Sequence, residues 1–177
     1  MNESRRLLQH FLAALAYRTQ KALRGAPSDF ADFNAGAQVR TPHELLWHMT
    51  GLMGYARTIF HGGEFAPPRL ETFKQEVERF HATLALLLKD FGNDKLTARI
   101  TDDQFLQGPL ADAMTHVGQL AMLRRLHGVP VPSENFIFAK VDAGNVGPNQ
   151  AEPVAPDLSW TPTRGHEPPG PSPHKRS

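Results

Sequence analysis

Apolar side chains recur at spacings of three and four residues in four segments of the chain, which is the pattern of amphipathic helices. The first segment runs from about Glu3 to Leu23. Its predicted inward face consists of Leu8, Phe11, Leu12, Leu15, Thr19, Ala22 and Leu23. The turn residues 25–28 end this helix, and the chain from there to Arg40 is expected to form a loop.

The second segment has the clearest start signal in the sequence. Thr41-Pro42-His43-Glu44 is a capping box with proline at the first helical position. The predicted inward face consists of Leu45, Met49, Leu52, Met53, Ala56, Ile59 and Phe60. Gly62-Gly63 ends the helix. His43 lies in the first turn, where we expect it to be exposed.

The third and fourth segments complete the pattern. A helix from about Leu70 to Phe91 is predicted, with Gly92 as its stop. Its inward face consists of Phe73, Val77, Phe80, Leu84, Leu87, Leu88 and Phe91. Residues 93–107 show no sustained period, and a last helix is expected to begin after Gly108-Pro109 and to reach about Leu126. Four amphipathic helices joined by loops predict an all-α four-helix bundle.

The composition changes at Pro148. Eight of the last thirty residues are proline, which is typical of an extended segment. We therefore predict a helical bundle domain over residues 1–147 and an extended or disordered Pro-rich C-terminal tail over residues 148–177.

Charge and composition argue against several classes of function. The formal net charge is +1, so the chain has no broad attractive field for nucleic acid. Because cysteine is absent, a disulfide framework and a thiolate-ligated metal are excluded, and the nine histidines leave imidazole and carboxylate as the available metal ligands. No segment approaches the roughly 20 apolar residues of a membrane span, and the N-terminus resembles an amphipathic helix more than an export signal. We expect a cytoplasmic protein that binds neither nucleic acid nor membranes.

The last predicted helix carries the candidate chemistry. Asp112 and His116 are four residues apart, so their side chains lie one turn apart on the same face and can reach one cation. Gln119 lies on the same stripe, as a donor behind a ligand or as a pocket wall. The opposite face is predicted to consist of Leu110, Met114, Val117 and Ala121. The ordinary alternative is that these polar residues form the solvated side of an amphipathic helix.

A third candidate ligand lies on the second predicted helix. His48 is at the edge of the apolar face, on the side shared by Tyr55 and Ile59, from which it can turn toward a neighbouring helix. An edge histidine is more often a hydrogen-bonded boundary residue than a metal ligand. If the two helices meet at this height, His48, Asp112 and His116 form a metal site. His81 is expected to be a boundary residue as well.

Two short motifs resemble the DinB/YfiT-like superfamily, whose members are four-helix bundles regarded as metal-dependent. The first is Arg-Thr-Pro-His-Glu-Leu-Leu-Trp-His over residues 40–48, and the second is Ala-Asp-Ala-Met-Thr-His-Val-Gly-Gln-Leu-Ala-Met-Leu-Arg-Arg over residues 111–125. In that family a histidine midway along the second helix joins two residues four apart on a later helix, the second being a histidine followed by x-Gly-Gln. His48 and the run from His116 to Gln119 match this pattern. Asp112 departs from it, because many members carry histidine there.

The resemblance implies an open divalent-metal site formed by His48, Asp112 and His116. Zinc, nickel, iron(II) and manganese all accept two imidazoles and one carboxylate. The implied function is that of a metal-dependent transferase or hydrolase acting on a small molecule, with transfer of a low-molecular-weight thiol as one form. Tyr55 and Gln119 are candidate pocket residues, catalytic residues are not assigned, and a homodimer is expected from the family's habit. The alternative is a non-catalytic, dimeric metal- or ligand-binding bundle of stress-response type.

Gly118 has a physical meaning of its own. A glycine within a helix costs up to about 1 kcal/mol relative to alanine. We therefore expect another backbone to approach the helix closely at this residue.

Overall fold

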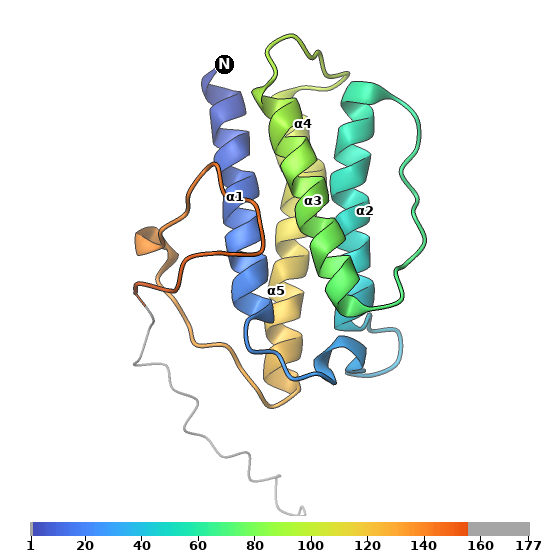
Figure 1. Ribbon diagram of the computed structural model, residues 1–177, viewed down its shortest axis with the longest axis vertical. Coiled ribbons are helices and arrows are strands. Elements are labelled where there is room, and N and C mark those ends of the chain that lie inside the picture. The colour runs from blue at the N-terminus through green and yellow to red at the C-terminus, as the bar shows by residue number, and fades with distance from the viewer. Residues whose placement is uncertain (1, 156–177) are drawn as a thin grey trace, which may run out of the picture. The chain divides into compact units, whose positions relative to one another are not determined.

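A computed structural model describes residues 2–155. All regular secondary-structure elements among these residues are helices. The four long helices are α1 (Glu3–Leu23), α2 (Pro42–His61), α3 (Phe73–Gly92) and α5 (Ala111–Leu126). They form a four-helix bundle, which confirms the predicted fold class (Figure 1).

Local sequence signals place the helix starts. Thr41 caps α2 by accepting a hydrogen bond from the Glu44 amide, and the Glu44 carboxylate accepts one from the Thr41 amide, so the predicted capping box is present. Thr72 and Gln75 form the same motif at α3. The α3 helix therefore begins at Phe73, three residues later than the apolar pattern predicted.

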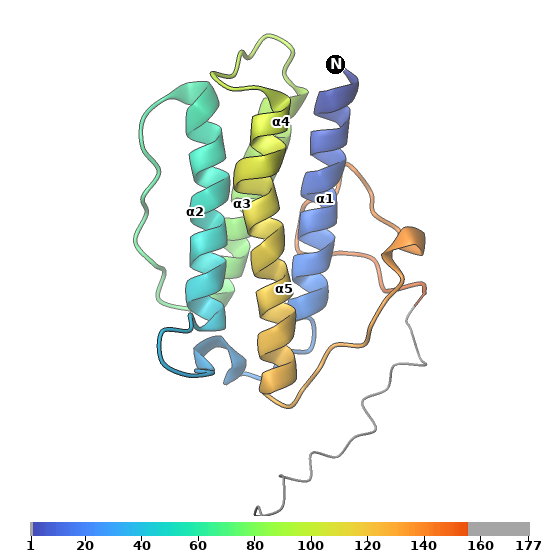
Figure 2. The ribbon, with the colours of Figure 1, turned by 180° about the vertical axis from the view of Figure 1, so that it is seen from behind.

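The order of the helices brings α2 beside α5. α1 packs against α3 and α5, and α2 packs against the same two helices. α2 and α3 run in the same direction, whereas α5 runs opposite to α2 (Figures 1 and 2). Because a parallel pair needs a long connection, residues 62–72 return along the outside of α2. We refer to residues 62–72 as the return segment, and it forms part of the site described below.

A short helix that was not predicted precedes the last long helix. A short helix, α4 (Asp102–Phe105), begins behind a capping box formed by Thr101 and Gln104. A π-helical turn, Leu106–Leu110, then joins it to α5. Proline inside an α-helix removes a backbone hydrogen bond and collides with the preceding turn. Here Gly108 leaves the helical conformation, with φ −91° and ψ −109°, and Pro109 is accommodated at the kink. The last long helix, α5, begins at Ala111, directly after this kink, so the prediction that it begins after Gly108-Pro109 is confirmed, whereas α4 and the π-helical turn before it were not predicted.

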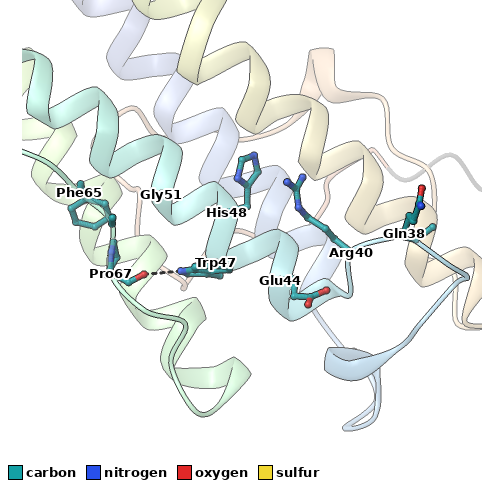
Figure 3. A pocket seen from close by; sticks show the side chains of 10 residues that line it. Gln38, Arg40, Glu44, Trp47, His48, Gly51, Phe65 and Pro67 are labelled. Carbon is teal, nitrogen blue, oxygen red and sulfur yellow. Dashed lines mark hydrogen bonds between the residues drawn. The ribbon is translucent and has the colours of Figure 1, made fainter.

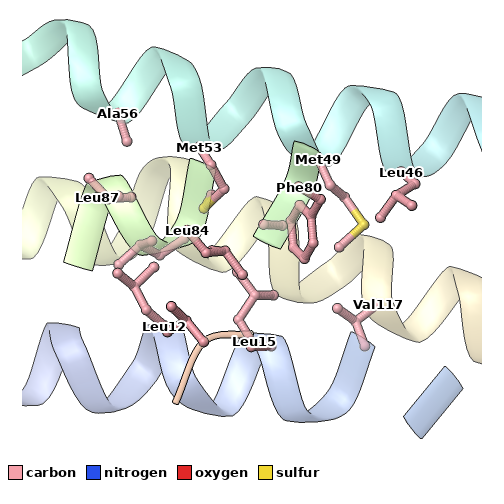
Figure 4. Packing of buried hydrophobic residues seen from close by; sticks show 14 of the residues in the cluster. Leu12, Leu15, Leu46, Met49, Met53, Ala56, Phe80, Leu84, Leu87 and Val117 are labelled. Carbon is pink, nitrogen blue, oxygen red and sulfur yellow. The ribbon is translucent and has the colours of Figure 1, made fainter. Parts of the chain in front are cut away.

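The core lies between the four long helices (Figure 4). Its largest fully buried side chains include Leu12 and Leu15 of α1, Leu46, Met49 and Met53 of α2, and Phe80, Leu84 and Leu87 of α3. The stretch expected to be a plain loop contains a short 3₁₀ helix, Phe30–Asp32, whose Phe30 is completely buried. The Arg124 guanidinium lies over the Phe30 ring and donates to the carbonyl oxygens of Ala22 and Arg24, which closes the end of α1.

The described chain divides into two units. Residues 140–152 belong with the bundle, and Val146 is buried in its core. Residues 132–139 and 153–155 form the other unit, which contains the 3₁₀ helix Phe136–Phe138. The predicted boundary after residue 147 stays a prediction, and residues 156–177 of the predicted tail lie outside the described part. Among the described residues, none of the helices has the length and apolar character that a membrane crossing requires.

Candidate metal centre

Three side chains from two helices converge beside the core. His48 comes from α2, and Asp112 and His116 come from α5. Each offers one nitrogen or oxygen atom, and these atoms all lie within 4.8 Å of one another. His116 is buried, His48 is half-buried and Asp112 is exposed, so the group opens to solvent on one side. The structure thus brings together the three residues that the sequence predicted as ligands.

The spacing on α5 produces half of this arrangement. Asp112 and His116 are one turn apart, and Asp112 Oδ1 lies 3.2 Å from His116 Nε2. The imidazole rings of His48 and His116 meet edge to face, with 4.7 Å between their centroids. His116 is buried, because it lies on the inward face of α5, which consists of Ala113, His116, Val117, Leu120, Leu123 and Arg124. The predicted division of α5 into a polar and an apolar face is therefore wrong at His116.

Gln119 orients the imidazole of His116. The two side chains are joined by a hydrogen bond of 2.8 Å between His116 Nδ1 and Gln119 Oε1. Because an amide oxygen only accepts, Nδ1 carries the hydrogen and the lone pair of a neutral ring is on Nε2. Nε2 and the Asp112 carboxylate then face each other as two electron-pair donors. A metal ion between them would accept an electron pair from each.

The surroundings of His48 favour its neutral form. Burial lowers the pKa of His48, the proximity of Arg40 and of the His116 ring lowers it further, and the Asp112 carboxylate acts in the opposite direction. Neutral imidazole is the form that binds metal ions. Arg40 therefore lies close enough to this group to contribute to its electrostatics.

Three surface depressions surround the centre. One, of about 650 Å³, lies between Arg40, Trp47, His48, Gly51, Phe65 and Pro67, and we call it the His48 depression (Figure 3). A second, of about 660 Å³, is bordered by Gln119, Leu45 and Met122. The third, of about 420 Å³, is bordered by both Tyr55 and Asp112. Both predicted pocket residues thus line depressions next to the ligand group, although neither lines the one beside His48.

Other expectations about single residues fail. His43 is buried, not exposed, because the Phe73 ring packs across it. His81 is 3% exposed and thus a core residue rather than a boundary residue. The expected close approach of another backbone at Gly118 is wrong as well, since a β-carbon there would meet nothing within 4 Å. The sequence reasoning passed over Arg40 and Trp47, although both lie within the first motif.

Comparisons of the chain with models of known protein families, with curated proteins and with solved structures found no match. The fold and the site therefore define the class of protein directly. It is an all-α four-helix bundle with a His-Asp-His group, on two adjacent helices, that is close enough to hold a metal ion.

Proposed function

We propose that the chain binds one divalent metal ion through His48, Asp112 and His116. The observation that carries this proposal is the convergence of the three ligand atoms to within 4.8 Å of one another. Ligands of one ion, with bonds of about 2.0–2.2 Å, lie roughly 3–4 Å apart. Small side-chain rotations, unhindered at the exposed Asp112, bring the three atoms to that spacing. The Gln119 hydrogen bond supports the proposal, because it directs Nε2 of His116 toward the shared point.

The site leaves coordination positions open, which is typical of reactive metals rather than purely structural ones. When bound, such an ion lowers the pKa of a coordinated water or thiol or polarises a carbonyl. Together with the two motifs that resemble the DinB/YfiT-like superfamily, this supports a metal-dependent enzyme acting on a small molecule. Thiol transfer and hydrolysis are the two reactions that we propose to test. Two imidazoles and one carboxylate accept zinc, nickel, iron(II) and manganese.

Metal analysis and metal titration test whether the chain binds a metal ion. The protein is purified without a polyhistidine tag, analysed for bound metals, stripped with a chelator and titrated with Zn²⁺, Ni²⁺, Mn²⁺ and, under nitrogen, Fe²⁺. We expect about one equivalent to bind to the wild type and none to Asp112→Ala at the same concentrations. His10→Ala removes an exposed histidine far from the centre in sequence and should bind like the wild type. A wild type that binds no metal ion would refute the proposal.

Turnover separates an enzyme from a binding protein. The metal-loaded protein is incubated with pairs of small thiols and electrophiles and with small amide and ester substrates. Metal-dependent turnover that is lost in Asp112→Ala supports the enzyme. Stoichiometric metal binding without turnover favours the non-catalytic bundle. Light scattering of the same samples tests the proposed homodimer.

A further inference from the structure

The His48 depression has one wall that is fixed before any ligand arrives. The Trp47 indole nitrogen donates a hydrogen bond of 2.9 Å to the Pro67 carbonyl oxygen, which ties α2 to the return segment (Figure 3). Phe65, also on the return segment, packs against Gly54 of α2. A β-carbon at Gly54 would lie 1.9 Å from the Phe65 ring, so only glycine admits the ring at this position. The wall is thus a preformed apolar and aromatic surface.

The opposite side of the same depression carries an unpaired positive charge. Arg40 has no hydrogen bond and no ion pair with any residue between 2 and 155, and it lies near enough to lower the pKa of His48. Figure 3 shows the Arg40 and His48 side chains pointing to the same side of α2. The carboxylate of Glu44, at the rim, accepts from the Thr41 amide and lies 3.9 Å from Arg69. That hydrogen bond and the charges of Arg69 and Arg40 lower the pKa of Glu44, but it makes no ion pair with Arg40. Arg40 therefore remains available to an anion from solution.

The floor of the depression is open next to His48. Gly51 lies one turn after His48 on α2, and a β-carbon there would meet nothing within 4 Å. Glycine in the middle of a helix costs stability. At Gly54 the close approach of Phe65 accounts for that cost, whereas at Gly51 no protein atom does. The space above Gly51 belongs to the depression, whose volume of about 650 Å³ is in the range of small-molecule sites.

We propose that the His48 depression binds the substrate of this centre, and that the substrate is a small carboxylate with an apolar or aromatic body. The carboxylate pairs with Arg40, whose planar guanidinium fits it in a bidentate fashion. The apolar body lies on Trp47 and Phe65, above Gly51. In this orientation, the part of the substrate between its carboxylate and its apolar body lies beside His48, one of the three residues proposed to bind the metal ion. The inference rests on the proposed function, because it names the substrate class of the same centre.

Fluorescence of Trp47 reports on occupancy directly. The chain has two tryptophans, so Trp160→Phe leaves Trp47 as the single indole. The probes are 3-phenylpropanoate and its neutral analogue 3-phenylpropanol, titrated with and without Zn²⁺. We expect saturable quenching by the acid and at least about tenfold weaker binding of the alcohol, because a charged hydrogen bond is lost. Equal affinities for acid and alcohol, or no saturable binding of the acid, would overturn the inference.

Two variants in the same background test the assigned roles. Arg40→Met removes the charge and should weaken binding of the acid about tenfold while leaving binding of the alcohol unchanged. Lys89→Gln removes one positive charge from an exposed position on α3 and is its matched control. Gly51→Leu should fill the floor and prevent binding of both probes, without lowering the melting temperature. Gly118→Leu, a change at an equally open helical glycine that lines none of the three depressions, should bind like the wild type.

Metal titration of the same proteins separates the two proposals. Acid binding that depends on Arg40 and Gly51, in a protein that binds no metal, would refute the metal centre and retain the depression as a carboxylate site. Metal binding without Arg40-dependent acid binding would refute the substrate class and retain the metal centre. Acid binding that persists unchanged in Gly51→Leu would place the probe elsewhere and overturn the inference.

Discussion

Two buried histidines of this bundle, His81 and His116, have opposite surroundings. His81 of α3 has a partner for each ring nitrogen: Nδ1 donates to the Val146 carbonyl oxygen at 2.7 Å, and Nε2 accepts from the Gln20 side-chain amide, also at 2.7 Å. Both bonds suit one neutral tautomer. His116 of α5 has an acceptor on each side, Gln119 on Nδ1 and the Asp112 carboxylate beside Nε2.

The difference separates a structural histidine from a ligand. Both ring nitrogens of His81 have hydrogen-bond partners when the ring is neutral, and burial lowers its pKa. A proton or a metal ion would therefore disrupt its environment. His116 instead has a second electron-pair donor, the Asp112 carboxylate, beside Nε2, so a metal ion between the two would satisfy both, and the ring of His48 is next to them. Burial alone does not distinguish the two residues. The chemistry of the partner on the second nitrogen does.

The largest expected effect is on metal affinity. His116→Ala removes one of three proposed ligands and should lower the affinity for Zn²⁺ by more than about a hundredfold. His81→Ala should leave the affinity unchanged, because neither of its nitrogens faces the centre. Calorimetric titration of both variants measures the contrast. Equal losses of affinity in the two variants would remove the distinction between these histidines.

The contrast should reverse when stability is measured. His81→Ala leaves the Val146 carbonyl and the Gln20 amide without their partner and opens a cavity, so we expect a loss of about 2–4 kcal/mol in the free energy of unfolding. In the absence of metal, His116→Ala should change that free energy much less, since it also relieves the opposition to Asp112. Urea denaturation in the presence of a chelator measures both. A larger loss for His116→Ala would contradict the assignment.

A smaller effect is expected at Gln119. Gln119→Leu removes the acceptor that orients His116 and should lower the Zn²⁺ affinity about 10–100-fold. Gln119→Glu keeps an acceptor at the same position and should retain the affinity of the wild type or exceed it. Because Gln119 is exposed, neither variant should alter the melting temperature of the metal-free protein appreciably. Identical affinities for the leucine and glutamate variants would show that Gln119 does not position the ring.

The smallest effect concerns pH. The folded protein holds His81 with a pKa below the ordinary 6.5, so the unfolded chain takes up the proton first as the pH falls. The free energy of unfolding should therefore decrease as the pH is lowered from about 6.5 through the pKa of the folded state. In His81→Ala this part of the decrease should be absent. Urea denaturation at several pH values tests it, and identical slopes for wild type and variant would contradict the neutral state of His81.

Local signals in the sequence were sufficient for much of the helix assignment. The capping box from Thr41 to Glu44 and the period of the apolar residues placed α2, because both act over a few residues. The same reasoning placed the start of α5 after Gly108-Pro109 but missed the helical residues that precede it. Residues 93–107 have no sustained period in the sequence, yet the chain forms α4 and a π-helical turn there, directly before α5. Burial of His43 likewise depends on Phe73, thirty residues further along the chain.

The sequence by itself determined that Asp112 and His116 share one face of a helix, since a spacing of four residues implies this wherever a helix forms. Only the tertiary structure decided that His48 meets them, because that contact depends on α2 packing against α5 rather than on any local period. The same holds for the wall of the His48 depression. Trp47 and Pro67 are twenty residues apart, and their hydrogen bond exists because the return segment runs back along α2.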